Sequence, residues 1–333
     1  MKHLFAFAVL IAFLAPAWAQ SPEQVEEQRA RQVTQPGNNA PVWREVHENE
    51  LLIQPSARFL GQDTRVTAGE AWRQFRNGPV TFYGGWLVIL VALAILAFYF
   101  TKGPVKVHEP STGRAIRRFS TLEQVVHWSV AISFCILGLT GLLMLFGKHV
   151  LLPLIGYTLF ASLTALGKNL HNFVAPFFIV SVSVMVLLFI RDNLPRLYDL
   201  RWFARAWAVM TRGEHVPTGR FNAGEKGWFW FGVVGLSVVV SWSGLVLLFP
   251  NFEQTRAVMQ DAWVVHATAA LLYIAISLGH IYLGTIGLEG SYQAMRRGYV
   301  DEAWAKEHHE YWYEEVKSDK RAPSGALHMK EQL

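Results

Sequence analysis

Five long apolar segments constrain the fold of this 333-residue chain more than any other feature of its sequence. They cover residues 83–99, 122–146, 170–190, 228–249 and 262–286. Each is close to the roughly 20 apolar residues that a helix needs to cross a hydrocarbon core of about 30 Å. None shows the alternation that is typical of a half-buried strand. The sequence therefore predicts an all-α integral membrane protein with five transmembrane helices.

The charged residues agree with a membrane protein and argue against a nucleic-acid binder. Charged side chains make up only 17% of the chain, whereas a soluble domain carries about a quarter. The net charge of +5 comes from Lys and Arg residues that flank the apolar segments. Anionic lipid and membrane topology account for basic residues in such places. We expect membrane lipid as a partner and no nucleic acid.

The first residues have the pattern of a secretory signal peptide. Lys2 supplies the positive charge, residues 4–14 are apolar, and Ala17-Trp18-Ala19 forms a small-x-small cleavage site. We predict a signal peptide over 1–19, and an uncleaved anchor remains the alternative.

The next part of the chain is polar and should be exported. Residues 20–80 contain one candidate amphipathic helix near 67–75, which Thr67 and Glu70 would cap. We predict a periplasmic segment over 20–80, followed by a first transmembrane helix over 81–101.

The basic residues also predict the orientation of the chain. The connectors before the second apolar segment and after the third, together with the tail, are rich in Lys and Arg. The short connectors on the other side carry only Lys148, Lys168 and Arg256. Because basic loops stay on the cytoplasmic side, we predict a multi-pass protein of the bacterial inner membrane. Its N-terminal segment would be periplasmic and its C-terminus cytoplasmic.

Four of the twelve histidines, namely His127, His171, His266 and His280, lie within the apolar segments. Ionisable residues are costly inside a membrane and usually serve a function there. His266 and His280 are fourteen residues apart on one predicted helix, which corresponds to about 21 Å along its axis and to nearly the same side. The predicted topology then places His171 level with His266 near the periplasm, and His127 level with His280 near the cytoplasm.

This arrangement predicts two haem b groups, one at each level. Haem iron is held by axial side chains, and two imidazoles on different helices can approach it from opposite sides. Zinc would need three or four ligands at one level, and a proton-relay transporter would need carboxylates at depth. We predict a dihaem cytochrome b with a cytoplasmic tail over 291–333.

Short stretches across residues 115–316 resemble a known family. They are RFS at 118–120, VHW at 126–128, LHNF at 170–173, RDNLP at 191–195, RFNAGEK at 220–226, VHA at 265–267, GHIY at 279–282 and WAKEHH at 304–309. In these stretches the chain resembles the gamma subunit, the cytochrome b, of respiratory formate dehydrogenases.

The resemblance implies a four-helix dihaem cytochrome b core over 115–290, preceded by one extra N-terminal transmembrane helix. It also implies an electron-transfer subunit without the catalytic centre. Its expected partners are an iron–sulfur beta subunit, which would feed electrons to the periplasmic haem, and a molybdenum or tungsten alpha subunit. A quinone, menaquinone or ubiquinone, would be reduced near the cytoplasmic haem, in a pocket that the resemblance assigns to Asn222 and Gly224, with His280 adjoining. Glu225 stands where the family can have Gln.

Three alternatives remain open at this point. The chain could be the cytochrome b of a nickel–iron hydrogenase or of a related periplasmic reductase, because the histidine spacing alone does not separate these families. It could also be a membrane anchor with structural haems, or a transporter that moves protons on its histidines.

Overall fold

The computed structural model describes residues 68–250, 252 and 254–318, and five of its helices are long and apolar enough to cross a membrane. They are Trp72–Lys102, Thr121–Val150, Leu152–Phe189, Ala223–Leu248 and Arg256–Gly287. The predicted mostly helical membrane fold is confirmed, and these five helices are candidates for the five predicted spans by their length and composition. The predicted signal peptide, most of the predicted periplasmic segment and the Thr67 cap lie outside the described residues.

The first transmembrane helix begins earlier than the sequence indicated. The amphipathic α5 (Ala68–Phe75) continues through a π-helical stretch, η1 (Arg76–Val80), into α6 (Thr81–Lys102). Pro79 lies inside this stretch, and a proline cannot donate the backbone hydrogen bond that a regular α-helix requires. The Thr81 hydroxyl donates to the Arg76 carbonyl at 2.7 Å. The expected break at residue 80 is therefore a local change of helix type.

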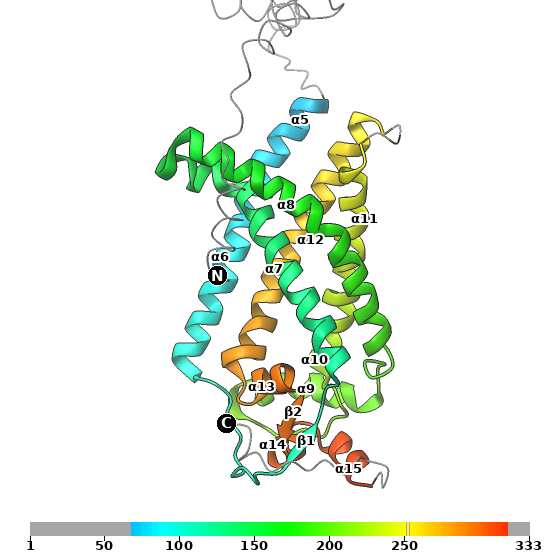
Figure 1. The fold of residues 1–333 in the computed structure, drawn as a ribbon. Coiled ribbons are helices and arrows are strands. Elements are labelled where there is room, and N and C mark those ends of the chain that lie inside the picture. Colours follow the sequence, from blue (N-terminus) through cyan, green and yellow to red (C-terminus); the bar gives the residue numbers. More distant parts are fainter. Residues whose placement is uncertain (1–67, 251, 253, 319–333) are drawn as a thin grey trace, which may run out of the picture.

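Four further helical stretches form a bundle beside α6 (Figure 1). They are α7 (Thr121–Val150), α8 (Leu152–Phe189), the stretch made of α10 (Ala223–Trp228), η2 (Phe229–Leu236) and α11 (Ser237–Leu248), and α12 (Arg256–Tyr282), which continues into η3 (Leu283–Gly287).

Polar caps set where these helices begin. The Ser120 hydroxyl accepts from the Glu123 backbone N–H at 3.2 Å, and the Glu123 carboxylate accepts from the Ser120 N–H at 2.7 Å. This capping box satisfies backbone groups that the first turn of α7 leaves without partners. At the start of α12, the Thr255 hydroxyl alone acts as the cap, accepting from the Val258 N–H.

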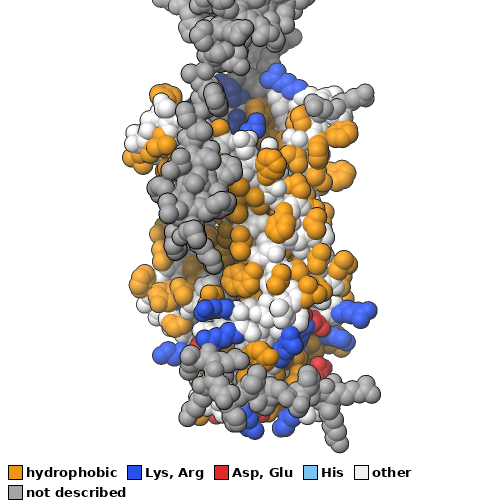
Figure 2. All heavy atoms as spheres, in the orientation of Figure 1, with side chains coloured by type: hydrophobic (Ala, Val, Ile, Leu, Met, Phe, Trp, Pro, Cys, Tyr) orange, Lys and Arg blue, Asp and Glu red, His pale blue; other side chains and the backbone are white. Residues whose placement is uncertain are grey.

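The outer surface of the bundle is apolar. Large side chains such as Leu139, Phe173, Leu187 and Trp242 are more than two-thirds exposed. Figure 2 shows hydrophobic side chains over the middle of the visible face, and Lys and Arg near both ends, mostly near the end opposite α5. An apolar surface of this extent is explained by contact with lipid.

A set of short elements covers the end of the bundle opposite α5. They are β1 (Ala115–Arg117), α9 (Leu197–Arg212), α13 (Ser291–Arg297), β2 (Tyr299–Asp301), α14 (Glu302–His308) and α15 (Glu310–Ser318). We call these elements and their loops the cap. The strands β1 and β2 pair antiparallel, with Ala115 opposite Asp301. Residues 291–318, which the sequence indicated only as a tail, are thus folded against the bundle, and the small sheet is a departure from the all-helical expectation.

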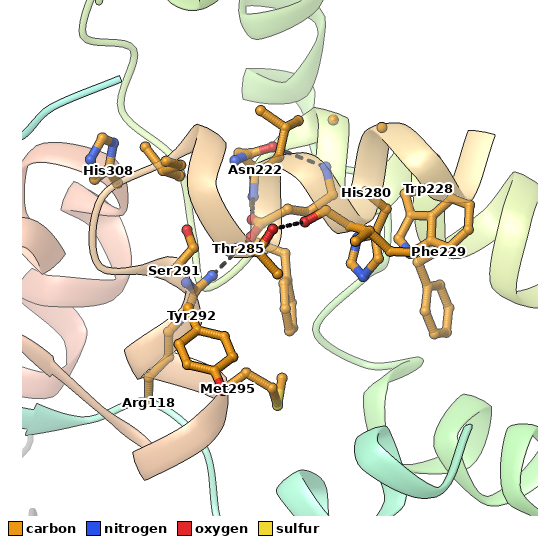
Figure 3. A pocket seen from close by; sticks show the side chains of 18 of the residues that line it. Arg118, Asn222, Trp228, Phe229, His280, Thr285, Ser291, Tyr292, Met295 and His308 are labelled. Carbon is orange, nitrogen blue, oxygen red and sulfur yellow. Dashed lines mark hydrogen bonds and ion pairs between the residues drawn. The ribbon is translucent and has the colours of Figure 1, made fainter. Parts of the chain in front are cut away.

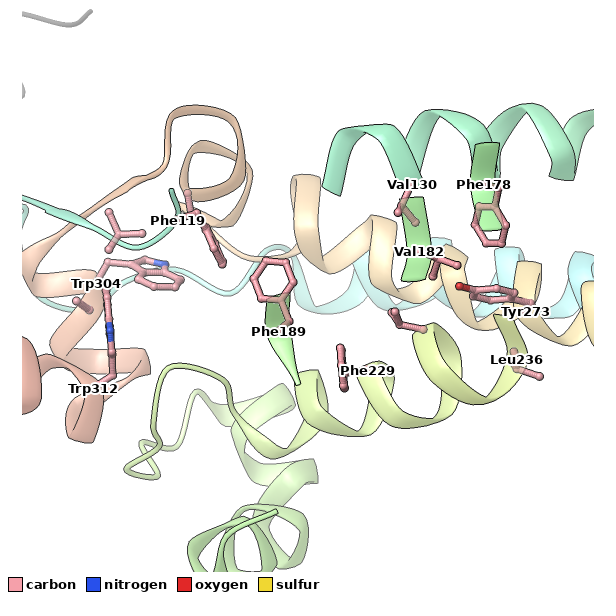
Figure 4. Packing of buried hydrophobic residues seen from close by; sticks show 14 of the residues in the cluster. Phe119, Val130, Phe178, Val182, Phe189, Phe229, Leu236, Tyr273, Trp304 and Trp312 are labelled. Carbon is pink, nitrogen blue, oxygen red and sulfur yellow. The ribbon is translucent and has the colours of Figure 1, made fainter. Parts of the chain in front are cut away.

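A continuous apolar core joins the cap to the bundle. Phe119, Phe189 and Phe229 lie between the helices and the cap residues Trp304 and Trp312 (Figure 4). Phe119 and Phe189 meet edge to face, with ring centroids 6.2 Å apart. The cap therefore has a fixed position under the bundle.

Candidate functional site

The structure brings the four intramembrane histidines together in the two pairs that the sequence suggested. His127 of α7 lies beside His280 of α12, with ring centroids 6.3 Å apart. His171 of α8 lies beside His266 of α12, with ring centroids 6.1 Å apart. Each pair therefore joins two different helices across the bundle.

The two pairs lie at different depths because α12 contributes one histidine to each. His266 and His280 are separated by fourteen residues of helix, or about 21 Å along the axis. The His127–His280 pair lies at the cap end, where both residues line a cavity with Asn222. The His171–His266 pair lies closer to α5.

The spacing of the rings fits one metal ion between the members of each pair. A metal–nitrogen bond of about 2 Å on each side, plus about 1 Å from each nitrogen to its ring centre, gives about 6 Å. Among the residues that the structure describes, no group of three or more His, Cys, Asp or Glu side chains could hold a metal ion. A metal that takes only two protein ligands, with the remaining positions filled by a planar group, matches haem iron.

Hydrogen bonds fix the protonation of the His171–His266 pair. His266 Nδ1 lies 3.0 Å from the Val240 carbonyl oxygen, which can only accept, so Nδ1 carries the proton. His171 Nδ1 lies 2.9 Å from the Thr140 hydroxyl, which donates its own hydrogen to the Ile136 carbonyl. Both rings therefore keep the Nε2 lone pair free, as a metal ligand requires.

Aromatic contacts hold the His127–His280 pair. His280 stacks on Trp228, with centroids 4.9 Å apart and planes 16° apart. Trp128 meets His127 edge to face at 5.5 Å. Within the described residues, the buried Nδ1 of His127 has no hydrogen-bond partner. Packing, more than hydrogen bonding, therefore positions these two rings.

Glycines leave room around the histidines. A Cβ atom on Gly244 would lie 3.1 Å from Cε1 of His266, and one on Gly141 would lie 3.6 Å from Cε1 of His171. Gly279, which precedes His280, has no neighbouring atom within 4 Å of its Cβ position and lines the cavity. This open space beside His280 can accommodate a large flat group.

The cavity at the cap end has a volume of about 670 Å³ and mostly apolar walls. Its wall includes the predicted site residues His127, His280, Asn222 and Gly224. Figure 3 shows Asn222, His280 and Trp228 around it, with His308 at its edge. A volume and lining of this kind are typical of sites for small apolar molecules.

The loop with Asn222 and Gly224 is shaped by its own contacts. Asn222 caps α10, because its Oδ1 accepts from the Glu225 N–H at 2.9 Å. A Cβ on Gly224 would come within 2.8 Å of the Trp202 ring, so only glycine fits there without a shift. The Asn222 side chain is therefore partly committed to the helix cap.

Glu225 has two structural partners. Its Oε2 accepts from the Asn222 N–H at 2.8 Å, which completes the capping box. Its Oε1 lies 3.1 Å from the buried guanidinium of Arg118, which also donates to the Arg220 carbonyl at 3.0 Å. A glutamine could keep the cap but could not neutralise Arg118. The carboxylate at this position thus balances the positive charge of Arg118 in the cavity wall.

Sequence reasoning missed several residues of the cavity wall. They are Trp228, Phe229, Thr285, Ser291, Tyr292, Met295 and His308. Phe229 and Thr285 lie in the π-helical stretches η2 and η3, and π-helical turns occur frequently at functional sites. The WAKEHH motif was the only available signal for His308, and it did not indicate a role.

The part of the chain that holds the histidine pairs and the cavity is similar to known proteins. Residues 118–298 match the profile of a family described as prokaryotic cytochrome b561. Over 205 residues, the chain is 31% identical to the formate dehydrogenase cytochrome b556(fdo) subunit of Escherichia coli K12, covering 61% of this chain and 93% of that protein. It is 28% identical over 211 residues to the nitrate-inducible cytochrome b556(Fdn) subunit of the same organism, covering 62% and 94%.

A third relative comes from another organism. The formate dehydrogenase cytochrome b556 subunit of Haemophilus influenzae is 26% identical over 212 residues, covering 62% of this chain and 86% of that protein. The residues that match the family profile include all four histidines of the two pairs, together with Asn222 and Gly224.

Proposed function

The chain belongs to the prokaryotic cytochrome b561 family, and from this membership we propose that it is the haem b electron-transfer subunit of a membrane-bound formate dehydrogenase. Three relatives at 26–31% identity carry the name of a formate dehydrogenase cytochrome b556 subunit. The observation that carries the proposal is that four histidines on three membrane-spanning helices face each other in two pairs, one pair at each of two depths.

Two haems b are the cofactors in this proposal. His171 and His266 would hold one, and His127 and His280 the other. Each haem, when bound, supplies reversible one-electron chemistry. The chain itself orients the ligands: Val240 and Thr140 accept from Nδ1 of two imidazoles, and Trp228 stacks on a third.

The electron acceptor would be a quinone in the cavity beside His280. Its mostly apolar wall suits a lipid-soluble molecule, and Asn222 supplies polar atoms at the wall. Electrons would enter at the His171–His266 level from an iron–sulfur subunit, which would receive them from a molybdenum or tungsten subunit. The names of the relatives, as subunits of formate dehydrogenase, support a complex with other subunits. The kinds of partner follow from the family resemblance.

The proposed location is the bacterial inner membrane, with the cap in the cytoplasm and the N-terminal segment in the periplasm. The Lys and Arg side chains gathered near the cap support this orientation (Figure 2). Quinone reduction would then take its protons from the cytoplasmic side.

A difference spectrum tests the proposed function. Membranes with and without this chain are reduced anaerobically with formate, and a b-type haem band is expected only where the chain is present. Added quinone should reoxidise it. A band that responds to hydrogen in place of formate would identify a hydrogenase cytochrome, and the absence of any chain-dependent band would contradict the cytochrome assignment.

The Thr140 hydroxyl should strengthen the binding of haem at the His171–His266 pair. Thr140→Val keeps the shape of the side chain but removes the hydroxyl that accepts from His171 Nδ1. Loss of such an outer partner typically lowers metal-site affinity by about 10–100-fold. We expect haem to transfer faster to a haem-scavenging apoprotein. Ser129→Ala on the same helix is the control, because the Ser129 hydroxyl donates only to the Val125 carbonyl; equal transfer rates in both variants would contradict the role of Thr140.

A further inference from the structure

The cavity wall at the cap end carries titratable side chains that electron transfer does not use. Glu307 and His308 come from α14, and Glu214 and His215 come from the loop after α9. All four line the same cavity as His280. Reduction of a quinone consumes protons as well as electrons, so ionisable groups in this wall have a chemical use.

Hydrogen bonds connect this cluster to water. The His108 side chain is 67% exposed, and its Nδ1 lies 2.7 Å from Oε1 of Glu307, whose side chain is only 14% exposed. On the other side, Nε2 of the half-exposed His215 lies 2.7 Å from Oε2 of Glu310, and His215 Nδ1 is hydrogen-bonded to the Glu307 carbonyl. Glu307 therefore lies between two solvent-accessible imidazoles and the cavity.

His308 extends this cluster into the cavity. It follows Glu307 in the chain, and its ring packs on Trp304 with centroids 5.0 Å apart. Its Nε2 is buried and has no hydrogen-bond partner among the described residues. Figure 3 shows the side chain at the cavity edge. A buried imidazole nitrogen without a partner, in the wall of a cavity, is available to a ligand.

The charges around His308 make its protonation sensitive to negative charge in the cavity. Burial lowers the pKa of His308 to about 4, Glu307 opposes this shift, and the cation Arg118 adds to it, so the imidazole is neutral at pH 7. The groups that interact with it electrostatically are Glu307 on α14, the neighbouring His309, Arg118 after β1, His215 after α9 and His108 after α6. Negative charge arriving in the cavity would favour the protonated form. Proton uptake would then follow electron arrival.

We propose that His308 is the final proton donor to a quinone bound in this cavity, and that His108, His215 and Glu307 supply it with protons from water. This inference rests on the proposed function. The quinone takes up two electrons from the electron path and one proton on each carbonyl oxygen. After each donation the neutral imidazole is reprotonated through Glu307, so the reaction balances with water as the proton source.

The test uses the intact complex in its membrane. The haems are first reduced with formate and then mixed with quinone in a stopped-flow spectrometer. For His308→Gln we expect formate reduction within twofold of wild type, and reoxidation by quinone slower by about 10²-fold, within the usual range for loss of a proton-transfer group. The deficit should shrink at acidic pH, and added imidazole should partly restore the rate in His308→Ala.

A binding measurement separates proton donation from pocket shape. A quinone analogue that cannot be reduced should bind His308→Gln within about threefold of wild type. Weakened binding that accounts for the slow reoxidation would mean that His308 only shapes the pocket, and the proposal would be wrong. Wild-type reoxidation with an unchanged pH profile would also overturn it.

Two further variants complete the design. Glu307→Gln can still hydrogen-bond to His108 but cannot carry a proton, so it should also slow reoxidation of the haems by quinone. If His308→Gln loses haem, Glu307→Gln becomes the variant that tests proton supply. His149→Gln, at the far end of α7, is the matched control and should behave as wild type. If wild-type haems are not reoxidised by quinone at all, the proposed function fails, which is a separate result.

Discussion

His280→Ala is expected to lower the haem content from two per chain to one and to abolish quinone reduction. The change removes one member of the His127–His280 pair and its stack on Trp228. Loss of an outer-shell partner costs about 10–100-fold in metal-site affinity, and loss of the ligand itself should cost more. Formate should still reduce the haem that remains, because His171 and His266 are intact. Haem is measured by the pyridine haemochrome spectrum, and electron transfer by reoxidation with quinone.

The opposite pair gives a contrasting result. His171→Ala should also leave one haem, but formate should no longer reduce it at a useful rate, since electrons would enter at the missing site. His149→Ala removes an exposed histidine from the end of α7 and should keep both haems. Two fully occupied haems in His280→Ala would show that the pairing of the ligands is wrong.

The largest expected effect on stability is that of Lys226→Met. The Lys226 ammonium lies 2.8 and 3.1 Å from the two carboxylate oxygens of Asp199, and the two side chains are only 6% and 8% exposed. Removing one partner of a buried ion pair typically costs about 3–5 kcal/mol, because the other charge stays buried without compensation. We expect the free energy of unfolding in detergent, followed by helical circular dichroism, to fall by about this amount.

Two comparisons isolate the origin of this effect. Adding Asp199→Asn to Lys226→Met removes the stranded charge and should recover part of the stability, since the amide oxygen can still accept from the Arg196 N–H. Arg205→Met breaks an exposed pair with Glu214, in which the side chains are 61% and 36% exposed. Exposed pairs contribute about 0–1 kcal/mol. Equal losses for Lys226→Met and Arg205→Met would contradict the argument.

The transmembrane helices could be predicted from the sequence because lipid imposes a length and an apolar composition on each of them. The pairing of the histidines could also be inferred, since fourteen residues of helix fix both the separation and the side on which His266 and His280 lie. The predicted topology then placed His171 at the depth of His266 and His127 at the depth of His280. These inferences depend on regular helix geometry, which a sequence encodes directly.

The cap could not be predicted from the sequence. The strand β1 has three residues and pairs with β2 far along the chain, so no local pattern indicates it. The π-helical stretches η2 and η3 have the composition of ordinary apolar helix, although they place Phe229 and Thr285 in the cavity wall. The site of His308 depends on this folded cap, which explains why the WAKEHH motif alone did not reveal it.

The unequal hydrogen bonding of the two histidine pairs has an energetic consequence. At the level of His171 and His266, each Nδ1–H has an acceptor, whereas the Nδ1 of His127 has none among the described residues. An imidazole that donates from Nδ1 is a more basic ligand at Nε2, and a more basic ligand favours oxidised iron. The reduction potential would therefore be lower near α5 and higher near the cap, and this difference would drive electrons in one direction across the membrane.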